Sequence, residues 1–209
     1  MNTTSIKPTA LSPGTIVLRV IFFLTGVATV YFLFTRAFPY LNYSTSEGRY
    51  GTDSILIFTH VVFGIAATVL GPFQFISAIR KKNVKVHRLM GKIYLISTLI
   101  AALVSWMIIV PKHDANLAYQ TGLFFLGFAW ISTGSMAYLA IRKGKVDIHR
   151  EWMVRSYVVT LAFVSFRLIA DILRSYNFEN VESTMAWMCW ALPLFVAEIV
   201  LQVPKIYED

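Results

Sequence analysis

The sequence predicts an all-α integral membrane protein, a bundle of six transmembrane helices around a duplicated four-helix core. The first observation behind this prediction is composition. Hydrophobic residues make up 56% of the 209 residues and charged residues only 14%, and the mean hydropathy is +0.61, which is more apolar than one soluble core requires. The second is an internal repeat that joins apolar runs in pairs. We therefore expect residues 1–209 to form a single integral membrane domain.

Six apolar runs are long enough to cross a bilayer. A hydrocarbon core about 30 Å thick requires about 20 apolar residues in a helix. The runs cover residues 16–34, 55–79, 89–110, 121–141, 152–173 and 185–203. The segment 35–53 is too polar to span, and we expect it to lie as a loop over one mouth of the bundle.

The internal repeat has an offset of 62 residues, since residue 78 corresponds to residue 140. Residues 78–88 (AIRKKNVKVHR) and 140–150 (AIRKGKVDIHR) are identical at seven of eleven positions. Because two spans separate the copies, both enter the membrane in the same sense, which predicts a parallel repeat about a two-fold axis along the membrane normal. The parts of the chain are then the tandem hairpins 55–110 and 121–173 and the flanking helices 16–34 and 185–203.

The two repeated turns are basic, and this predicts the orientation of the chain. Residues 80–88 contain five Lys or Arg and no acidic residue, and residues 142–151 contain four basic and two acidic residues. The positive-inside rule places such turns in the cytoplasm, so we expect a bacterial inner-membrane protein with both termini cytoplasmic. The turns also explain the net charge of +8. The expected partner is therefore the lipid bilayer and not nucleic acid.

One face of the second span is small or polar throughout. His60, Gly64, Ala67, Gly71 and Gln74 recur at intervals of three or four residues, which places them on one helical face. Ionisable groups at membrane depth are costly and often functional, so His60 and Gln74 are candidate ligand-binding residues. A close-packed contact between helices explains the same pattern.

Pro72 interrupts the same span. Proline has no backbone N–H, so it leaves the carbonyl of Thr68 without its helical partner. The sequence therefore predicts a kink at this point.

The fifth span carries a predicted ion pair. Arg167 and Asp171 are four residues apart, a spacing at which opposite charges on a helix neutralise each other. A rise of about 1.5 Å per residue puts Arg167 and His60 each roughly 10 Å below the same membrane surface. The two residues can meet if their helices are neighbours.

A second polar layer is predicted near the cytoplasmic surface. It contains Gln74, His87, Arg88, Tyr94, His149, Arg150, Arg155, Tyr157 and Glu198. The repeat gives His87 and His149 equal depth, and two neutral imidazoles at one depth can ligate a haem b iron. This layout is loosely similar to that of cytochrome b561 proteins, although each histidine precedes its helix and is followed by an arginine. The alternative is an interfacial role, in which the arginines attract anionic lipid headgroups and the imidazoles flank the helix starts.

Three motifs together resemble a known family. They are His60 followed by Gly-Pro-Phe-Gln-Phe at 71–75, His-Arg-Leu-Met-Gly-Lys-Ile-Tyr at 87–94, and His-Arg-Glu-Trp-Met-Val-Arg-Ser-Tyr at 149–157. Over about residues 55–172 the chain resembles the bacterial predicted-membrane-protein family called domain of unknown function 2306. The resemblance implies an integral membrane protein with no established activity, so it assigns motif positions and no catalytic roles.

These observations leave several functions open. The helix core is predicted to bind a small cofactor or lipid-like ligand, haem b or quinone, with an electron-transfer protein as a further partner. A transporter of small molecules or ions, or a scaffold with no catalytic role, would use the same polar residues as a pathway or as internal packing contacts. Whether the protein is an enzyme is not decided. The candidate ligand-binding residues are His60, Gln74, His87, His149, Arg155 and Arg167, with His87 and His149 as haem ligands and Arg167–Asp171 as the intramembrane ion pair.

Overall fold

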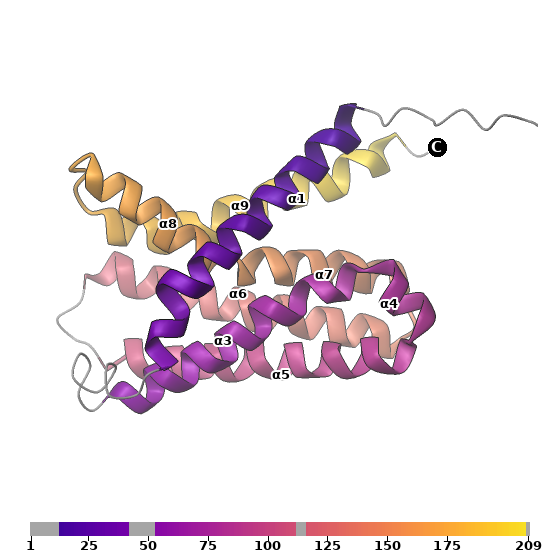
Figure 1. The fold of residues 1–209 in the computed structure, drawn as a ribbon, viewed down its shortest axis with the longest axis horizontal. Helices are drawn as coiled ribbons and strands as arrows, with labels where there is room; N and C mark the ends of the chain where they lie inside the picture. Colours follow the sequence, from indigo (N-terminus) through magenta and orange to yellow (C-terminus); the bar gives the residue numbers. More distant parts are fainter. Residues whose placement is uncertain (1–12, 42–52, 112–115, 208–209) are drawn as a thin grey trace, which may run out of the picture.

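The computed structural model describes residues 13–41, 53–111 and 116–207, with side chains from Phe23 onward in the first helix, and every regular element in these ranges is a helix (Figure 1). The all-α prediction is thus confirmed. The α-helices are α1 (Pro13–Phe32), α3 (Ser54–Phe75), α4 (Ser77–Lys82), α5 (Val84–Ile109), α6 (Leu117–Arg142), α7 (Val146–Thr160), α8 (Ala162–Ser175) and α9 (Val181–Ile206). A π-helical turn, η1 (Leu33–Ala37), and a 3₁₀ turn, η2 (Phe38–Leu41), follow α1.

Five helical segments of the described chain are long and apolar enough to cross a membrane. They are α3, α5, α6, α7 together with α8, and α9, and they correspond to the second to sixth predicted spans. The first predicted span forms α1, which is not among these five. The count of six spans therefore stays a prediction.

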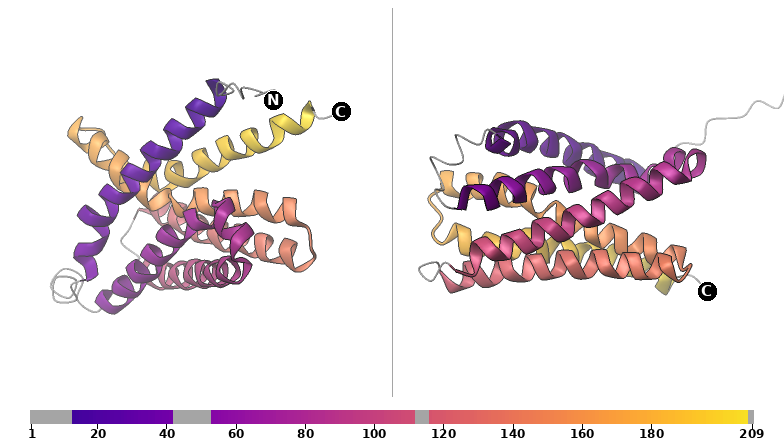
Figure 2. Two further views of the ribbon diagram at one scale, coloured as in Figure 1. Left: turned by 45° about the vertical axis from the view of Figure 1, so that its right-hand side comes forward. Right: turned by 90° about the horizontal axis from the view of Figure 1, so that it is seen from below.

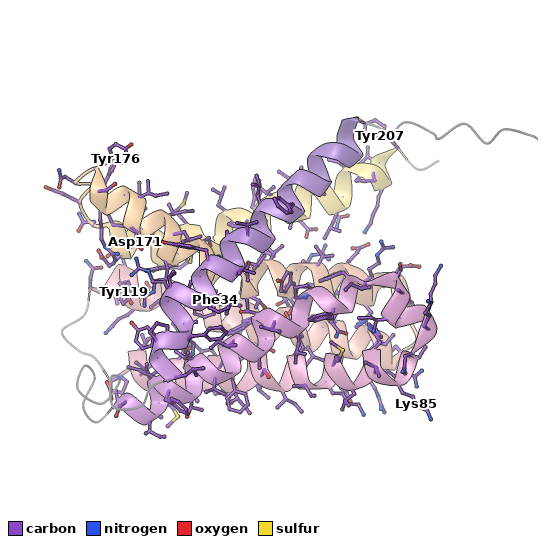
Figure 3. The ribbon with its side chains drawn as sticks, viewed as in Figure 1. Phe34, Lys85, Tyr119, Asp171, Tyr176 and Tyr207 are labelled. Carbon is purple, nitrogen blue, oxygen red and sulfur yellow. The ribbon has the colours of Figure 1, made fainter. Side chains whose placement is uncertain are left out.

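Four helices form a bundle. The helix α3 packs along α5, α6 packs along α7, and contacts of α5 with α6 and of α3 with α7 close the group. The helix α9 contacts α6, α7 and α8, whereas α1 crosses outside the bundle and contacts α8 (Figures 1 and 2). The start of α1 and the end of α9 lie toward the end of the bundle that holds α4 and the α6–α7 turn. Figure 3 shows Lys85 at this end and Tyr119 toward the opposite one.

Many of the fully buried residues are alanines, and many large apolar side chains are exposed on the outside. Phe23 is 67% exposed and Leu117 is 73% exposed. This distribution suits a bundle in lipid, where close helix packing depends on small side chains and the outer surface faces hydrocarbon. The fully buried alanines are Ala67, Ala101, Ala102, Ala137, Ala162, Ala170 and Ala186.

The repeated His-Arg pairs lie inside helices, which corrects the prediction that they precede them. The helix α5 begins directly after Asn83, whose side chain accepts a hydrogen bond of 3.2 Å from the backbone N–H of Val86, the bond of a helix N-cap. The helix α7 begins shortly after Gly144, which has a φ of +72° and reverses the chain. His87 and His149 therefore occupy the first turns of their helices. The apolar pattern starts later because these first turns are polar.

The fifth predicted span, 152–173, is two helices and not one. Leu161, with φ −71° and ψ −6°, separates α7 from α8, and α8 leaves the direction of α7 (Figure 1). Residues 152–173 contain no proline or glycine. Instead, the hydroxyl of Thr160 donates to the carbonyl of Ser156 at 2.9 Å, a bond that often bends helices.

Candidate functional site

Two cavities in the described part of the bundle contain most of the predicted site residues. The larger one, called the large cavity below, has a volume of about 310 Å³ and lies between η1, η2, α3, α5, α6 and α8. It lies toward the bundle end that is opposite α4. Its wall is mainly aliphatic and aromatic, and its titratable lining residues are Arg36, Tyr40, His60, Tyr119 and Arg167.

The segment predicted as a loop, 35–53, begins as part of this wall. Arg36, Ala37 and Tyr40 line the large cavity from the helical turns η1 and η2. The beginning of the segment is therefore helical, which corrects the loop prediction there. Residues 42–52 lie outside the described residues.

His60 faces the large cavity with one ring nitrogen already bonded. Its Nδ1 lies 2.9 Å from the carbonyl oxygen of Ala101 in α5. A carbonyl only accepts, so Nδ1 carries a proton and donates it, and the neutral ring then presents the lone pair of Nε2. The ring also contacts Phe163 edge to face, at 5.2 Å between centroids.

Arg167 lines the same cavity from α8, so the structure brings His60 and Arg167 together. The predicted ion pair between Arg167 and Asp171 does not form. The Asp171 carboxylate instead binds Arg36 and, at 2.9 Å, Arg174, because i,i+3 spacing serves a helical ion pair as well as i,i+4 and η1 adds a second cation. Arg167 has no ion-pair partner among the described residues, and its guanidinium carbon lies 5.8 Å from the ring centroid of Phe166.

A buried polar network lies between the two cavities. The Nε1–H of Trp130 donates to Thr160 Oγ1 at 2.8 Å, and the hydroxyl of Tyr94 lies 2.9 Å from both Thr160 Oγ1 and Ser156 Oγ. Thr160 gives its only proton to the Ser156 carbonyl, so it accepts from Trp130 and Tyr94. Ser156 then donates to Tyr94. Every hydroxyl is satisfied, which makes this network (below, the polar seal) a rigid part of the core.

Tyr157 of α7 packs against α3 beside Pro72. A Cβ on Gly71 would lie 2.3 Å from the ring of Tyr157, so only glycine leaves room for this ring. The Tyr157 hydroxyl donates to the carbonyl of Thr68 at 3.4 Å. This is the carbonyl predicted to lose its partner to Pro72, so α7 supplies part of the bond that α3 lacks.

The second cavity, called the small cavity below, has a volume of about 150 Å³ and lies at the end of the bundle with the basic turns. The structure places three predicted site residues here, His87, His149 and Gln74. Their helices α5, α7 and α3 meet at this end. The complete lining is Gln74, Phe75, Arg80, His87, Val146, Asp147, His149, Arg150 and Met153.

Polar atoms at the small cavity differ in how well they are bonded. His149 Nδ1 donates to the carbonyl of Ala137 at 2.8 Å. Gln74 Nε2 and His87 Nδ1 are buried and have no hydrogen-bond partner among the described residues. Unpaired buried polar atoms are rare and costly, so the hydrogen bonding of these two side chains is incomplete.

Arg155 lines neither cavity. Its Nε donates to Glu198 at 2.7 Å and its Nη1 to Glu151 at 3.4 Å, while its guanidinium lies 4.7 Å from the ring centroid of Trp152. Lys205 also binds Glu151, at 2.6 Å. This group holds α9 against α7, so we assign Arg155 to packing and not to ligand binding.

The small cavity does not fit a haem held by His87 and His149. Both residues line it, but its volume of about 150 Å³ is half the lower limit of about 300 Å³ for small-molecule pockets. Arg80 and Arg150 also border it. In the described part of the chain, no group of three or more His, Cys, Asp or Glu is placed to hold a metal ion.

The sequence placed Tyr94 in the inner polar layer but did not predict its bonds in the polar seal, and it gave Arg36 and Arg80 only as charges of connecting segments, not as residues at the cavity margins. One signal was present for the seal, because Tyr94 and Ser156 are 62 residues apart, the offset of the repeat. Arg36 had no such signal, since its partner Asp171 is 135 residues away.

The sequence was compared with known families, curated proteins and solved structures. The model of the family described as "Predicted membrane protein (DUF2306)" matches residues 57–201. No curated protein and no solved structure matches the chain.

Proposed function

The chain belongs to the predicted membrane protein family DUF2306, and on this premise we propose that it binds a small lipid-like ligand of the quinone class in the large cavity. One observation supports this most directly. Nε2 of His60 and the guanidinium of Arg167 form no hydrogen bond or ion pair with another described residue, and both residues line the same largely apolar cavity. Such a cavity suits a molecule with an apolar body and one or two oxygen atoms at its polar end.

The hydrogen-bonding chemistry of His60 and Arg167 indicates which polar groups the ligand carries. A guanidinium only donates, so Arg167 calls for a carbonyl or another oxygen acceptor. The neutral ring of His60 accepts at Nε2, which suits a hydroxyl. A quinone offers the carbonyl and its reduced form offers the hydroxyl. The volume of about 310 Å³ lies at the lower end of the range of roughly 300–1,000 Å³ for ligand pockets, which suits a single ring with short substituents.

The proposal includes the membrane arrangement around this cavity. We place α1 as a sixth span beside a duplicated core in a bacterial inner membrane, with the basic turns and both termini in the cytoplasm. Contacts between repeat-equivalent residues support the duplication. His87 and His149 line one cavity, and Tyr94 and Ser156 share a hydrogen bond, as expected near a two-fold axis.

Transport is a second candidate, favoured by the break at Leu161. Interrupted helices near the membrane centre often border transporter substrate sites, and Ala162, directly after the break, lines the large cavity. The equivalent helix of the first hairpin, α5, runs unbroken from Val84 to Ile109. The break is therefore a feature of one hairpin only, which gives transport less support than ligand binding.

The experiment is a titration of the detergent-purified protein with a short-chain benzoquinone, followed by tryptophan emission. Trp130 lines the large cavity, so a bound quinone should quench it. We expect saturable quenching, with Arg167→Gln and His60→Leu each weakening the apparent affinity roughly tenfold, the equivalent of about 1.4 kcal/mol. Arg142→Gln, an exposed cation of the α6–α7 end, is the matched control.

Trp130→Phe separates binding from its optical readout. It should remove most of the quenching while a quinone-induced rise in the melting temperature persists. Quenching that does not saturate, or that is equal in the wild type and in both cavity variants, would contradict the proposal and leave a scaffold role. Quinone-independent uptake of small anions into liposomes, lost in Arg167→Gln, would favour transport.

A further inference from the structure

The small cavity has a different chemistry from the large one and is not used by the proposed quinone site. We propose that it is an oxyanion site that binds one phosphate group, supplied either by the headgroup of an anionic lipid or by free phosphate. The first step is the position of Gln74. This residue is only 6% exposed, and its Nε2, a donor, has no hydrogen-bond partner in the part of the chain that the structure describes. It lines the cavity from the last turn of α3.

Packing explains why Gln74 is held at this place. A Cβ on Gly91 would lie 3.1 Å from Gln74 Oε1, so the amide lies directly over α5 where that helix has no side chain. Burial of an amide without full bonding is unfavourable unless a partner completes it. A phosphate oxygen is a suitable partner, because it accepts the hydrogen bond that Nε2 offers.

The charges around the cavity favour an anion over a metal ion. Two arginines, Arg80 of α4 and Arg150 of α7, border it against a single carboxylate, Asp147. Arginine binds phosphate oxygens with two parallel hydrogen bonds, which strengthens and orients the contact. A divalent cation would meet more positive than negative charge here. The two imidazoles, His87 and His149, add ring nitrogens that can donate to an oxyanion once they carry a proton.

The location also suits a phosphate. The cavity lies beside the basic turns, at the level where a bundle in a bilayer meets lipid headgroups. Exposed apolar side chains such as Ile76 and Leu89 surround this end, so a lipid could place its headgroup in the cavity and its chains along the helices. A volume of about 150 Å³ admits a headgroup phosphate and no larger cofactor.

The test measures the melting temperature of the purified, delipidated protein in a neutral maltoside detergent. Three additions are compared: inorganic phosphate, short-chain phosphatidylglycerol and a short-chain diacylglycerol without phosphate. We expect a saturable rise with phosphatidylglycerol, with phosphate or with both, and none with diacylglycerol. A rise with phosphatidylglycerol alone assigns the site to a lipid headgroup. A rise with phosphate that competes with the lipid assigns it to free phosphate.

Variants show whether the effect arises in the small cavity. Arg150→Gln and Arg80→Gln should each weaken the half-saturating concentration at least tenfold, and Gln74→Leu, which removes the unpaired donor, should do so without loss of folding. Arg142→Gln changes an exposed cation that does not line the cavity and should leave the response unchanged. The proposal is overturned if no phosphate-bearing addition gives a saturable rise, or if the cavity variants respond as Arg142→Gln does.

Discussion

The large and small cavities lie in one bundle but differ in chemistry. Rings and aliphatic side chains form most of the wall of the large cavity, and of its two arginines Arg36 binds Asp171 whereas Arg167 has no ion-pair partner among the described residues. Two arginines and an unpaired amide border the small cavity. Between them, Tyr94, Thr160 and Trp130 form the polar seal. The comparison shows that one helical bundle can contain a largely apolar cavity and a cationic cavity.

The largest expected effect on stability comes from the contact between Gly71 of α3 and Tyr157 of α7. In Gly71→Ala the new Cβ would lie 2.3 Å from the ring of Tyr157. The ring must move, and overpacking of this kind costs roughly 1–3 kcal/mol. Unfolding in a detergent titration should show this loss in the free energy of unfolding.

Gly64→Ala in the same helix is the matched control. Nothing lies within 4 Å of a Cβ at Gly64, so this change should be neutral or slightly stabilising, since alanine is the better helix former. Adding Tyr157→Leu to Gly71→Ala should recover part of the loss. Equal destabilisation by the two alanine variants would refute the packing of Tyr157 against Gly71.

A smaller effect is expected when the polar seal itself is weakened. Tyr94→Phe removes the hydroxyl that joins α5 to α7 and leaves Ser156 and Thr160 each short of one partner. The expected loss is about 1–2 kcal/mol of unfolding free energy. Tyr138→Phe, at a tyrosine that is 45% exposed, should change it by less than about 0.5 kcal/mol. Similar losses for the two tyrosines would argue against the seal.

The smallest effect tests which cation of the large cavity has a partner. Asp171→Asn removes bonds to Arg36 and Arg174 at a partly exposed site, so it should cost about 0.5–1 kcal/mol. Arg167→Gln should change stability by less than about 0.5 kcal/mol while weakening quinone binding. Equal losses of unfolding free energy in the two variants would instead support the Arg167–Asp171 ion pair that the sequence predicts.

Much of the fold followed from the sequence. Apolar runs of bilayer length predicted six spans, and the described chain has five helical segments that are long and apolar enough to cross a membrane. His87 and His149, which are 62 residues apart, line one cavity. Helical spacing also put His60 and Gln74 on one face of α3, although the two side chains reach different cavities. Spacing along a helix gives a direction around its axis, and it does not show what lies opposite.

The candidate site was predicted only in part. The depths of His60 and Arg167 could be worked out from helical rise, and both residues do line the large cavity. The break at Leu161 could not, because it has no proline or glycine and accompanies hydrogen bonds that Thr160 makes to other helices. Arg155 looked equally available for a ligand, but Glu198 from α9 bonds it.

The sequence by itself determined the class of this protein, because hydrophobicity, helical periodicity and loop charge are local properties, and a bilayer constrains the chain through these properties directly. Tertiary structure decided which polar groups find partners. Asp171 is bonded by an arginine 135 residues away, while among the described residues Arg167 has no ion-pair partner and Gln74 Nε2 has no hydrogen-bond partner. Pairing of this kind depends on distances between helices, and neither composition nor periodicity contains those distances.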